Sequence, residues 1–310
     1  MAGAIRVMLA LLVADVAAGP VLSGQVPVDS GGSCVACHGS LPADDRLGAP
    51  ARMYVGDIHA ERGFGCVACH GGDAAAPGFE AMDPARGFVG RPRGRTLLES
   101  CGRCHSSAEF MRRYNPSLRV DQVAEYRTSV HGQRLLQNRD TSVATCSSCH
   151  TPHRIRPPSD PNSSVHPLRV TATCGACHAD AERMRPYGIR TDQRERYEQS
   201  IHWRTVSEAG DLSAPVCNDC HGNHGAAPPG VSWVGNVCGQ CHSTMAERFR
   251  ASRHAQTFAM LGVPGCATCH SNHDIQEATV HLLGLDSGAV CAGCHTAEDP
   301  GGVVAAGMRG

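Results

Sequence analysis

The stretch CSSCHTPH, residues 146–153, contains the pattern on which the whole chain is built. Its first five residues have the spacing Cys-x-x-Cys-His, and a further histidine follows three residues later at His153. The five-residue motif occurs nine times and uses all 18 cysteines of the chain. The cysteine pairs are Cys34 and Cys37, Cys66 and Cys69, Cys101 and Cys104, Cys146 and Cys149, Cys174 and Cys177, Cys217 and Cys220, Cys238 and Cys241, Cys266 and Cys269, and Cys291 and Cys294. The histidines that complete the motifs are His38, His70, His105, His150, His178, His221, His242, His270 and His295.

This motif has the spacing needed for covalent haem attachment. Each of the two thiols adds to one vinyl group of a haem, and the adjacent histidine then lies under the iron as the proximal ligand. A disulfide framework does not require a histidine after every second cysteine, and a zinc site pairs two half-motifs without that fifth residue. Nine motifs with no cysteine left over therefore predict nine covalently attached haem c groups.

The composition indicates how such a chain is held together. One motif occurs for about every 34 of the 310 residues, and the chain has only 13 aromatic residues. That is too little polypeptide for nine separate hydrophobic cores, so the flat apolar haems must form the core. We expect a mainly α fold with extensive loops, repeated dihaem units and little or no β-sheet. Without haem the polypeptide should be largely unfolded.

The charge and the N-terminus exclude some classes and indicate a location. All 28 basic residues are arginines, balanced by 29 acidic ones, so no basic surface for nucleic acid is expected. No segment reaches the roughly 18 apolar residues that a membrane span needs. Arg6 followed by the apolar run 7–13 resembles a secretory signal, assigned to residues 1–24, with an uncleaved N-terminal anchor as the alternative. The protein is therefore expected to be periplasmic or otherwise extracytoplasmic.

From Cys34 to His295 the chain resembles the multihaem c-type cytochromes, including the class III cytochrome c-like and octahaem reductase-related superfamily. The resemblance implies haem attachment outside the cytoplasm and a role in electron transport, for example in anaerobic respiration. It also implies redox partner proteins, either a quinol-oxidising membrane complex or other cytochromes. A membrane-associated complex fits this picture, and the oligomeric state is left open.

An internal repeat organises the motifs. The residues Cys101, His105, Met111 and Tyr114 recur 73 positions later, and the segment from Asp121 to His131 recurs 71 positions later. The unit is aromatic-x-x-Ser-x-His, then Cys-x-x-Cys-His-x-x-His, then a second Cys-x-x-Cys-His. In the first unit His59 lacks the preceding Ser, and Asp73 replaces the final histidine. The expected segments are 25–49 with one haem, a degenerate unit at 50–108, units at 109–181, 182–245 and 246–298, and a tail at 299–310.

The sequence pattern indicates helices and loops in outline. Residues 121–136 and 192–206 are expected to be helices that carry His131 and His202, the second started by Asp192 and Glu195 as a capping pair. Short helices should follow His105, His178 and His242. Segments 74–95, 154–167 and 225–230, rich in proline and glycine, should be loops.

Nine further histidines match the nine irons in number: His59, His131, His153, His166, His202, His224, His254, His273 and His281. Two imidazoles on every iron would close the sixth position and favour electron exchange over chemistry. A histidine three residues after a motif is too close to reach the opposite face of its own haem, so it should reach a neighbouring iron. Met111 and Met184 are interpreted as packing residues, and some arginines are expected to pair with haem propionates.

Three functions follow from this ligand count. The leading one is electron transfer along a chain of mostly bis-histidine haems. The alternative is a reductase of a small nitrogen or sulfur oxyanion with one open haem, for which the Cys34 haem is the best candidate, followed by those of Cys101 and Cys238. Variants with a lysine-ligated haem are excluded because the chain has no lysine. A haem filament with ligands donated between chains is the third hypothesis.

Overall fold

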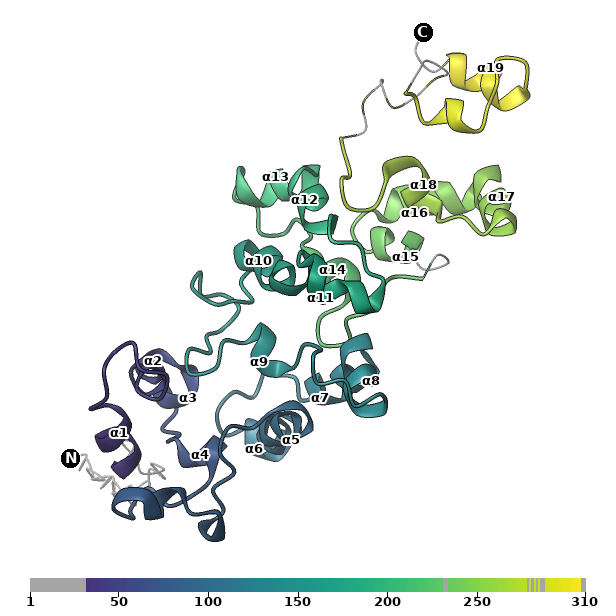
Figure 1. Cartoon of the computed structure of the whole chain (residues 1–310). Helices are drawn as coiled ribbons and strands as arrows, with labels where there is room; N and C mark the ends of the chain where they lie inside the picture. Colours follow the sequence, from purple (N-terminus) through teal and green to yellow (C-terminus); the bar gives the residue numbers. More distant parts are fainter. Residues whose placement is uncertain are drawn as a thin grey trace, which may run out of the picture.

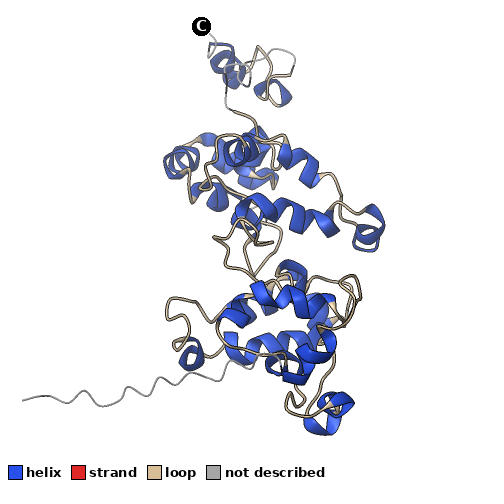
Figure 2. Cartoon of the chain, turned by 90° about the vertical axis from the view of Figure 1, so that its left-hand side faces the viewer, coloured by secondary structure: helices blue, strands red, loops and turns tan. Residues whose placement is uncertain are grey.

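The computed structural model describes residues 32–230, 234–277, 279, 282, 284 and 288–307. The predicted signal segment and His281 lie outside these residues. The described chain consists of short helices and loops and contains no strand (Figure 2). The prediction of a mainly α fold with extensive loops is confirmed. In the described part no helix is long and apolar enough to cross a membrane.

The α-helices follow one another along the chain, and the last of them lies in the predicted tail. They are α1 (Gly32–His38), α2 (Ala49–Met53), α3 (Ile58–Glu61), α4 (Val67–His70), α5 (Gly94–His105), α6 (Ala108–Met111), α7 (Gln122–Thr128), α8 (Val130–Gln137), α9 (Cys146–Cys149), α10 (Pro167–His178), α11 (Ala181–Met184), α12 (Gln193–Glu198), α13 (Ile201–Ser207), α14 (Cys217–His221), α15 (Val234–Gly239), α16 (Ser243–Ala251), α17 (Arg253–Leu261), α18 (Gly265–His270) and α19 (Pro300–Gly307). Short 3-10 turns lie between some of them, such as η2 (Gly78–Met82) and η3 (Pro84–Arg86) in the first predicted loop.

The helices form an elongated arrangement in which sequence order is also spatial order (Figure 1). Helices α1 to α9 lie toward one end, α10 to α18 follow, and α19 lies at the other end. Contacts are mostly between elements near in sequence, such as α7 with α8 and α15 with α16. Such an arrangement is typical of repeat proteins, in which each unit contacts mainly its neighbours.

Buried side chains are few for a chain of this length. Within the described residues fourteen hydrophobic side chains are buried, and five of these are alanines. One cluster joins Leu98, Val123, Tyr126 and Leu135, and a second, built from the next repeat, joins Val170, Val206 and Val216. A polypeptide of this size normally buries about three quarters of its surface. Side chains alone therefore do not supply a continuous core.

The two central repeats fold alike. Helices α5 and α10 each have 12 residues and end at the histidine of a motif. Each is followed by a four-residue helix, α6 or α11, with a buried methionine. The expected short helices after His105, His178 and His242 are thus present as α6, α11 and α16.

Each of the two longer predicted helices is in fact two helices. The chain is extended at Ser129 (ψ 159°) and at Ser200 (ψ 158°), where α8 and α13 begin. The hydroxyl of Ser129 accepts from the backbone N–H of Gly132 at 2.9 Å, and that of Ser200 accepts from Trp203 at 3.1 Å. Both serines are fully buried. The prediction missed the break because an N-cap serine satisfies a new helix start without proline or glycine.

The predicted capping pair of Asp192 and Glu195 is wrong. Asp192 stands at the N-cap of α12 but makes no side-chain cap hydrogen bond. Its carboxylate instead accepts from Arg190 Nε at 3.2 Å. Arginine competes for the carboxylate because a charged, forked donor is a stronger partner than a backbone N–H.

Replacing the buried cap serine should destabilise the repeat. We expect Ser129→Ala to lower the free energy of unfolding by about 1 kcal/mol, because the N–H of Gly132 loses its acceptor. The exposed Ser142→Ala variant should change it by less than about 0.5 kcal/mol. Guanidinium titration of the haem-loaded protein, followed by circular dichroism, measures both. Equal effects of the two substitutions would contradict the cap assignment.

Candidate functional site

Seven of the motif histidines lie opposite one of the nine further histidines. In each pair the two ring centroids are 6.0–6.3 Å apart. The pairs are His59 with His105, His153 with His70, His131 with His178, His224 with His150, His202 with His242, His273 with His221, and His254 with His295.

The spacing fits one metal atom between each pair of rings. A bond of about 2.0 Å from metal to nitrogen and about 1.1 Å from nitrogen to ring centroid place two opposed imidazoles about 6.2 Å apart. The angle between the rings varies from 5° for His70 and His153 to 87° for His59 and His105, yet both distances are 6.0 Å. Rings stacked in direct contact would lie closer than rings meeting edge to face. A constant gap at any angle is what two ligands of one iron require, so the residues fit a haem.

The histidines at the start of α3, α8, α13 and α17 all follow one pairing rule. Each is paired with the second motif after it in the chain, as His131 is with His178 beyond the Cys146 motif. The Cys101 and Cys238 haems, named above as further candidates for an open iron, each have a facing histidine, because His59 and His202 lie opposite their motif histidines. Closeness in the sequence does not predict these pairs, because each helix histidine lies opposite the second motif after it and not the first.

The histidines that follow a motif obey a second rule. His153, His224 and His273 are each paired with a motif of the preceding unit, as His224 is with His150. This agrees with the expectation that they reach a neighbouring iron. In the first unit Asp73 takes the place of this histidine and forms an ion pair with Arg86 at 2.6 Å.

One backbone hydrogen bond recurs at each junction between units. The donor is the backbone N–H of the residue that follows the N-cap of α3, α8 or α13. The acceptor is the backbone carbonyl two residues after the histidine that follows a motif in the next unit. The bonds are Ile58 to Ile155 at 2.9 Å, Val130 to Ala226 at 3.1 Å and Ile201 to Ile275 at 2.8 Å. The same contact therefore fixes the position of the histidine on the helix relative to the histidine that follows the motif.

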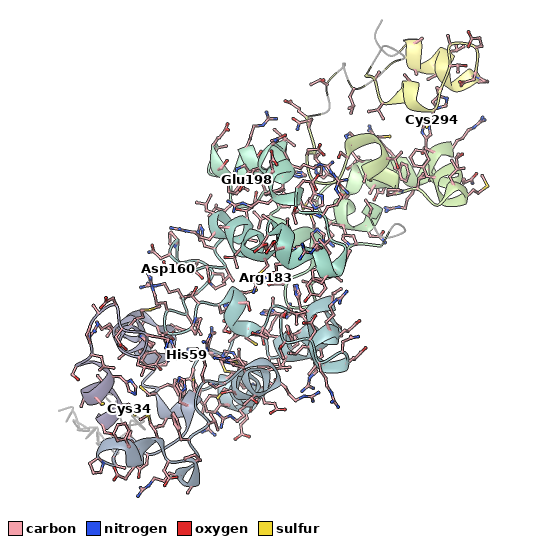
Figure 3. The ribbon with its side chains drawn as sticks, viewed as in Figure 1. Cys34, His59, Asp160, Arg183, Glu198 and Cys294 are labelled. Atoms are coloured by element: carbon pink, nitrogen blue, oxygen red, sulfur yellow. The ribbon has the colours of Figure 1, made fainter. Side chains whose placement is uncertain are left out.

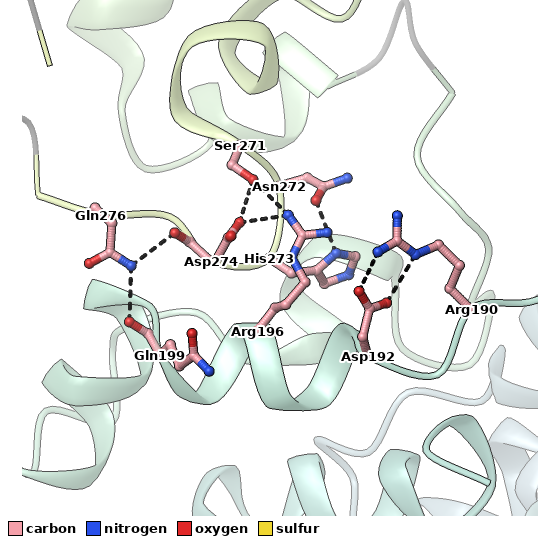
Figure 4. A network of polar contacts seen from close by, with 9 residues as sticks. All are labelled: Arg190, Asp192, Arg196, Gln199, Ser271, Asn272, His273, Asp274 and Gln276. Carbon is pink, nitrogen blue, oxygen red and sulfur yellow. Dashed lines mark hydrogen bonds and ion pairs between the residues drawn. The ribbon is translucent and has the colours of Figure 1, made fainter. Parts of the chain in front are cut away.

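The junction to the last unit carries an additional polar network (Figure 4). Arg196 of α12 donates to Asp274 Oδ1 at 2.8 Å and to Ser271 Oγ at 3.0 Å, and the Ser271 hydroxyl donates to Asp274. Ser271 has φ 63° and ψ −169°, a region otherwise occupied here by the equivalent Gly71 and Gly222. Serine in this glycine region costs about 1–3 kcal/mol. The network offsets that strain and fixes the loop that carries His273.

Hydrogen bonds at the outer ring nitrogens favour the tautomer that ligates metal. Nδ1 lies 2.7 Å from the Gly90 carbonyl in His70, 2.9 Å from Asp57 in His59 and 2.9 Å from Asp299 in His295. When Nδ1 donates, Nε2 is left unprotonated and free for iron. Figure 3 shows His59 in the N-terminal part of the molecule, and its partner Asp57 is 1% exposed.

Burial keeps many of these imidazoles neutral. Loss of solvation lowers the pKa of His150 to about 4, with a further contribution from the nearby His224. The same cause lowers the pKa of His105, His131, His178 and His202. A neutral imidazole is the form that binds iron.

Cysteines of successive motifs are neighbours. The Cys101 thiol is hydrogen-bonded to Cys146, which raises the pKa of Cys101, and Cys174 with Cys217 repeats this arrangement. Burial, followed by the nearby Cys174, raises the pKa of Cys149 to about 11. Cysteines of every two successive motifs are therefore neighbours from the second motif to the ninth. The remaining neighbours are Cys69 with Cys104, Cys220 with Cys241, Cys238 with Cys266, and Cys269 with Cys291. No group of three or more His, Cys, Asp or Glu side chains within the described residues has the arrangement of a separate metal site.

Two motif histidines, His38 and His270, have no ring partner among the described contacts. A cavity of about 230 Å³ is lined by Cys269, His270 and Leu282, the residue after His281. His166 is not brought to a motif histidine: it is 4% exposed and caps α10, where its Nδ1 accepts from Leu168 at 3.3 Å. Its predicted role as an iron ligand gains no support from these contacts.

The remaining predicted residues can also be placed. Met111 and Met184 are buried at equivalent positions, in line with packing roles. Trp203 packs against the second hydrophobic cluster. Arg156 donates to Asp160 at 2.7 Å, while its buried Nε has no partner in the described part of the chain. That orphaned donor fits the expectation that an arginine meets a haem propionate.

One comparison with known proteins gives a match. Residues 211–296, which include four of the nine motifs, match the family model described as Cytochrome c3. The match supports a multihaem c-type cytochrome with covalently bound haem c, a class of electron-transfer protein. The comparisons with curated proteins and with solved structures give no match.

Removal of one paired histidine should open one iron. We expect His202→Ala to convert one ferric iron from low spin to high spin, because its partner His242 remains as the single strong ligand. Electron paramagnetic resonance of the oxidised protein measures this change, and the exposed Ser207→Ala on the same helix is the control. An unchanged low-spin spectrum with full haem content would show that His202 is not a ligand.

Proposed function

We propose that this protein is an exported nonahaem cytochrome that transfers electrons along a chain of mostly bis-histidine haems. The single observation that carries this proposal is the set of seven histidine pairs at 6.0–6.3 Å. An iron closed on both faces exchanges electrons with little reorganisation and offers no position to substrate. Covalent haem attachment and the predicted N-terminal signal support a periplasmic or otherwise extracytoplasmic location.

The spatial order of the motifs supports a continuous path. Cysteines of consecutive motifs are neighbours from the second motif to the ninth, so the haems bound there lie near one another. Cys34 and Cys294 lie toward opposite ends of the molecule (Figure 3). Electrons entering at one end would leave at the other. We propose respiratory redox proteins as donor and acceptor, either a quinol-oxidising membrane complex or other cytochromes.

The His270 iron has a candidate ligand. Leu282 lines the cavity beside His270, and His281 directly precedes Leu282 in the sequence. We therefore assign His281 to this iron. His166 caps α10, which contacts α9 and α11 to α14, so among the described residues we assign no second imidazole to the His38 iron.

The His38 iron favours a second candidate function. Residues 1–31 contain no histidine, and the element that α1 contacts, η2 (Gly78–Met82), carries none either. An iron with one imidazole leaves its sixth position open to a small ligand. The alternative is therefore a multihaem reductase of a small nitrogen or sulfur oxyanion that reacts at the Cys34 haem.

Spectroscopy of the intact oxidised protein separates the two functions. As an electron carrier, the protein should give only low-spin ferric signals and bind no carbon monoxide after reduction, with another group closing the His38 iron. A stoichiometric high-spin signal, with uptake of one carbon monoxide per chain and reoxidation by nitrite or tetrathionate, would overturn the carrier function in favour of the reductase. Haem content by mass, with nine haems expected, is measured on the same sample.

A further inference from the structure

Asp57 is a buried carboxylate that contacts a proposed iron ligand directly. It is 1% exposed, and its Oδ1 lies 2.9 Å from His59 Nδ1 and accepts from the His59 backbone N–H at 2.9 Å. Its Oδ2 accepts from the backbone N–H of Ile155, in the next unit, at 2.7 Å. Two backbone N–H groups thus donate to Asp57 and its third contact is the His59 ring nitrogen, so every contact suits an ionised carboxylate, which only accepts.

The equivalent residues in the other units are neutral. Ser129, Ser200 and Ser252 occupy the N-cap position two residues before His131, His202 and His254. The Ser129 and Ser200 hydroxyls bond to backbone groups of their own helix and neighbouring turn. Serine is thus sufficient to begin the helix. Asp57 also begins a helix, but a buried carboxylate is costly unless it has a further partner. That partner is the ring nitrogen Nδ1 of His59.

We propose that Asp57 is a positioning residue that lowers the reduction potential of the Cys101 haem relative to the haems of Cys174 and Cys238. The inference rests on the proposed function, which places an iron between His59 and His105. An imidazole whose Nδ1–H is held by a carboxylate is a more basic ligand at Nε2. Greater electron donation and a nearby negative charge both favour the ferric over the ferrous iron.

Glu125 Oε2 lies 3.8 Å from His224 Nδ1, beyond hydrogen-bond distance, and Asp299, which is within that distance of His295, lies in a different environment. Asp299 is 2.9 Å from Nδ1 of His295, but its side chain is 36% exposed. Water and ions screen an exposed charge more strongly than a buried one. The Asp299 carboxylate should therefore shift its haem less than Asp57 does.

The test compares three variants by spectroelectrochemical titration of the full haem-loaded chain. Asp57→Asn keeps the shape and the cap acceptor but removes the charge, and Asp57→Ser installs the residue of the other units. We expect both to move one of the nine one-electron midpoints to a higher potential and to alter the resonance g-values of one low-spin iron. The exposed Asp211→Asn, whose carboxylate contacts only Ser213, should leave every midpoint in place.

Haem content and spin state separate the possible failures. If Asp57→Asn keeps nine haems and all low-spin irons but no midpoint moves, Asp57 acts only as a helix cap and the inference is wrong. If the unmodified protein lacks a low-spin haem at Cys101, the proposed pairing of His59 with His105 fails instead. The reciprocal Ser200→Asp should lower the potential of the Cys238 haem, and a rise there would also contradict the inference.

Discussion

Two imidazole rings held about 6 Å apart are the constraint on which the rest of this structure depends. A motif supplies one ring with its two thiol attachments, but the second ring must approach from the opposite face at a fixed distance. That distance recurs seven times, at ring angles from 5° to 87°. The helix caps, the hydrogen bonds at the junctions and the polar network that holds the strained loop at Ser271 all help to position the second ring. The small side-chain clusters around Leu98 and Val170 are consistent with a fold whose core is supplied by haem.

The two pairing rules interlock neighbouring units. A helix histidine reaches forward past one motif, whereas a histidine after a motif reaches back to the preceding unit. Units so linked cannot order their ligands independently, which gives an elongated chain cooperativity that its sparse apolar contacts would not provide. Both rules have exceptions toward the ends of the described chain. Asp73 stands where the later units have the histidine that reaches back, and the motif histidines His38 and His270 have no ring partner among the described contacts.

Small substitutions within the repeat adapt each junction. Ser129 and Ser200 begin their helices with a hydroxyl, while the first unit uses the carboxylate of Asp57 at the same place. The last junction accepts an unfavourable backbone conformation at Ser271, held by Arg196 and Asp274. Such differences leave the spacing of the facing rings unchanged but alter the charge beside individual histidine pairs. A repeated scaffold can in this way carry haems of unequal potential.

The sequence by itself determined the class of cofactor, the mainly α fold and the need for histidines such as His153 to reach another iron. These follow from local chemistry: thiol spacing, helix propensity and the short reach of three residues. Tertiary structure alone decided that His59 meets His105 and that His202 meets His242, because the opposing ring comes from across an intervening motif. It also decided the helix breaks at Ser129 and Ser200, where a buried hydroxyl satisfies the backbone. Sequence spacing shows what one segment can do, whereas the ring that faces each of the seven paired motif histidines comes from a segment whose approach depends on how the chain folds back.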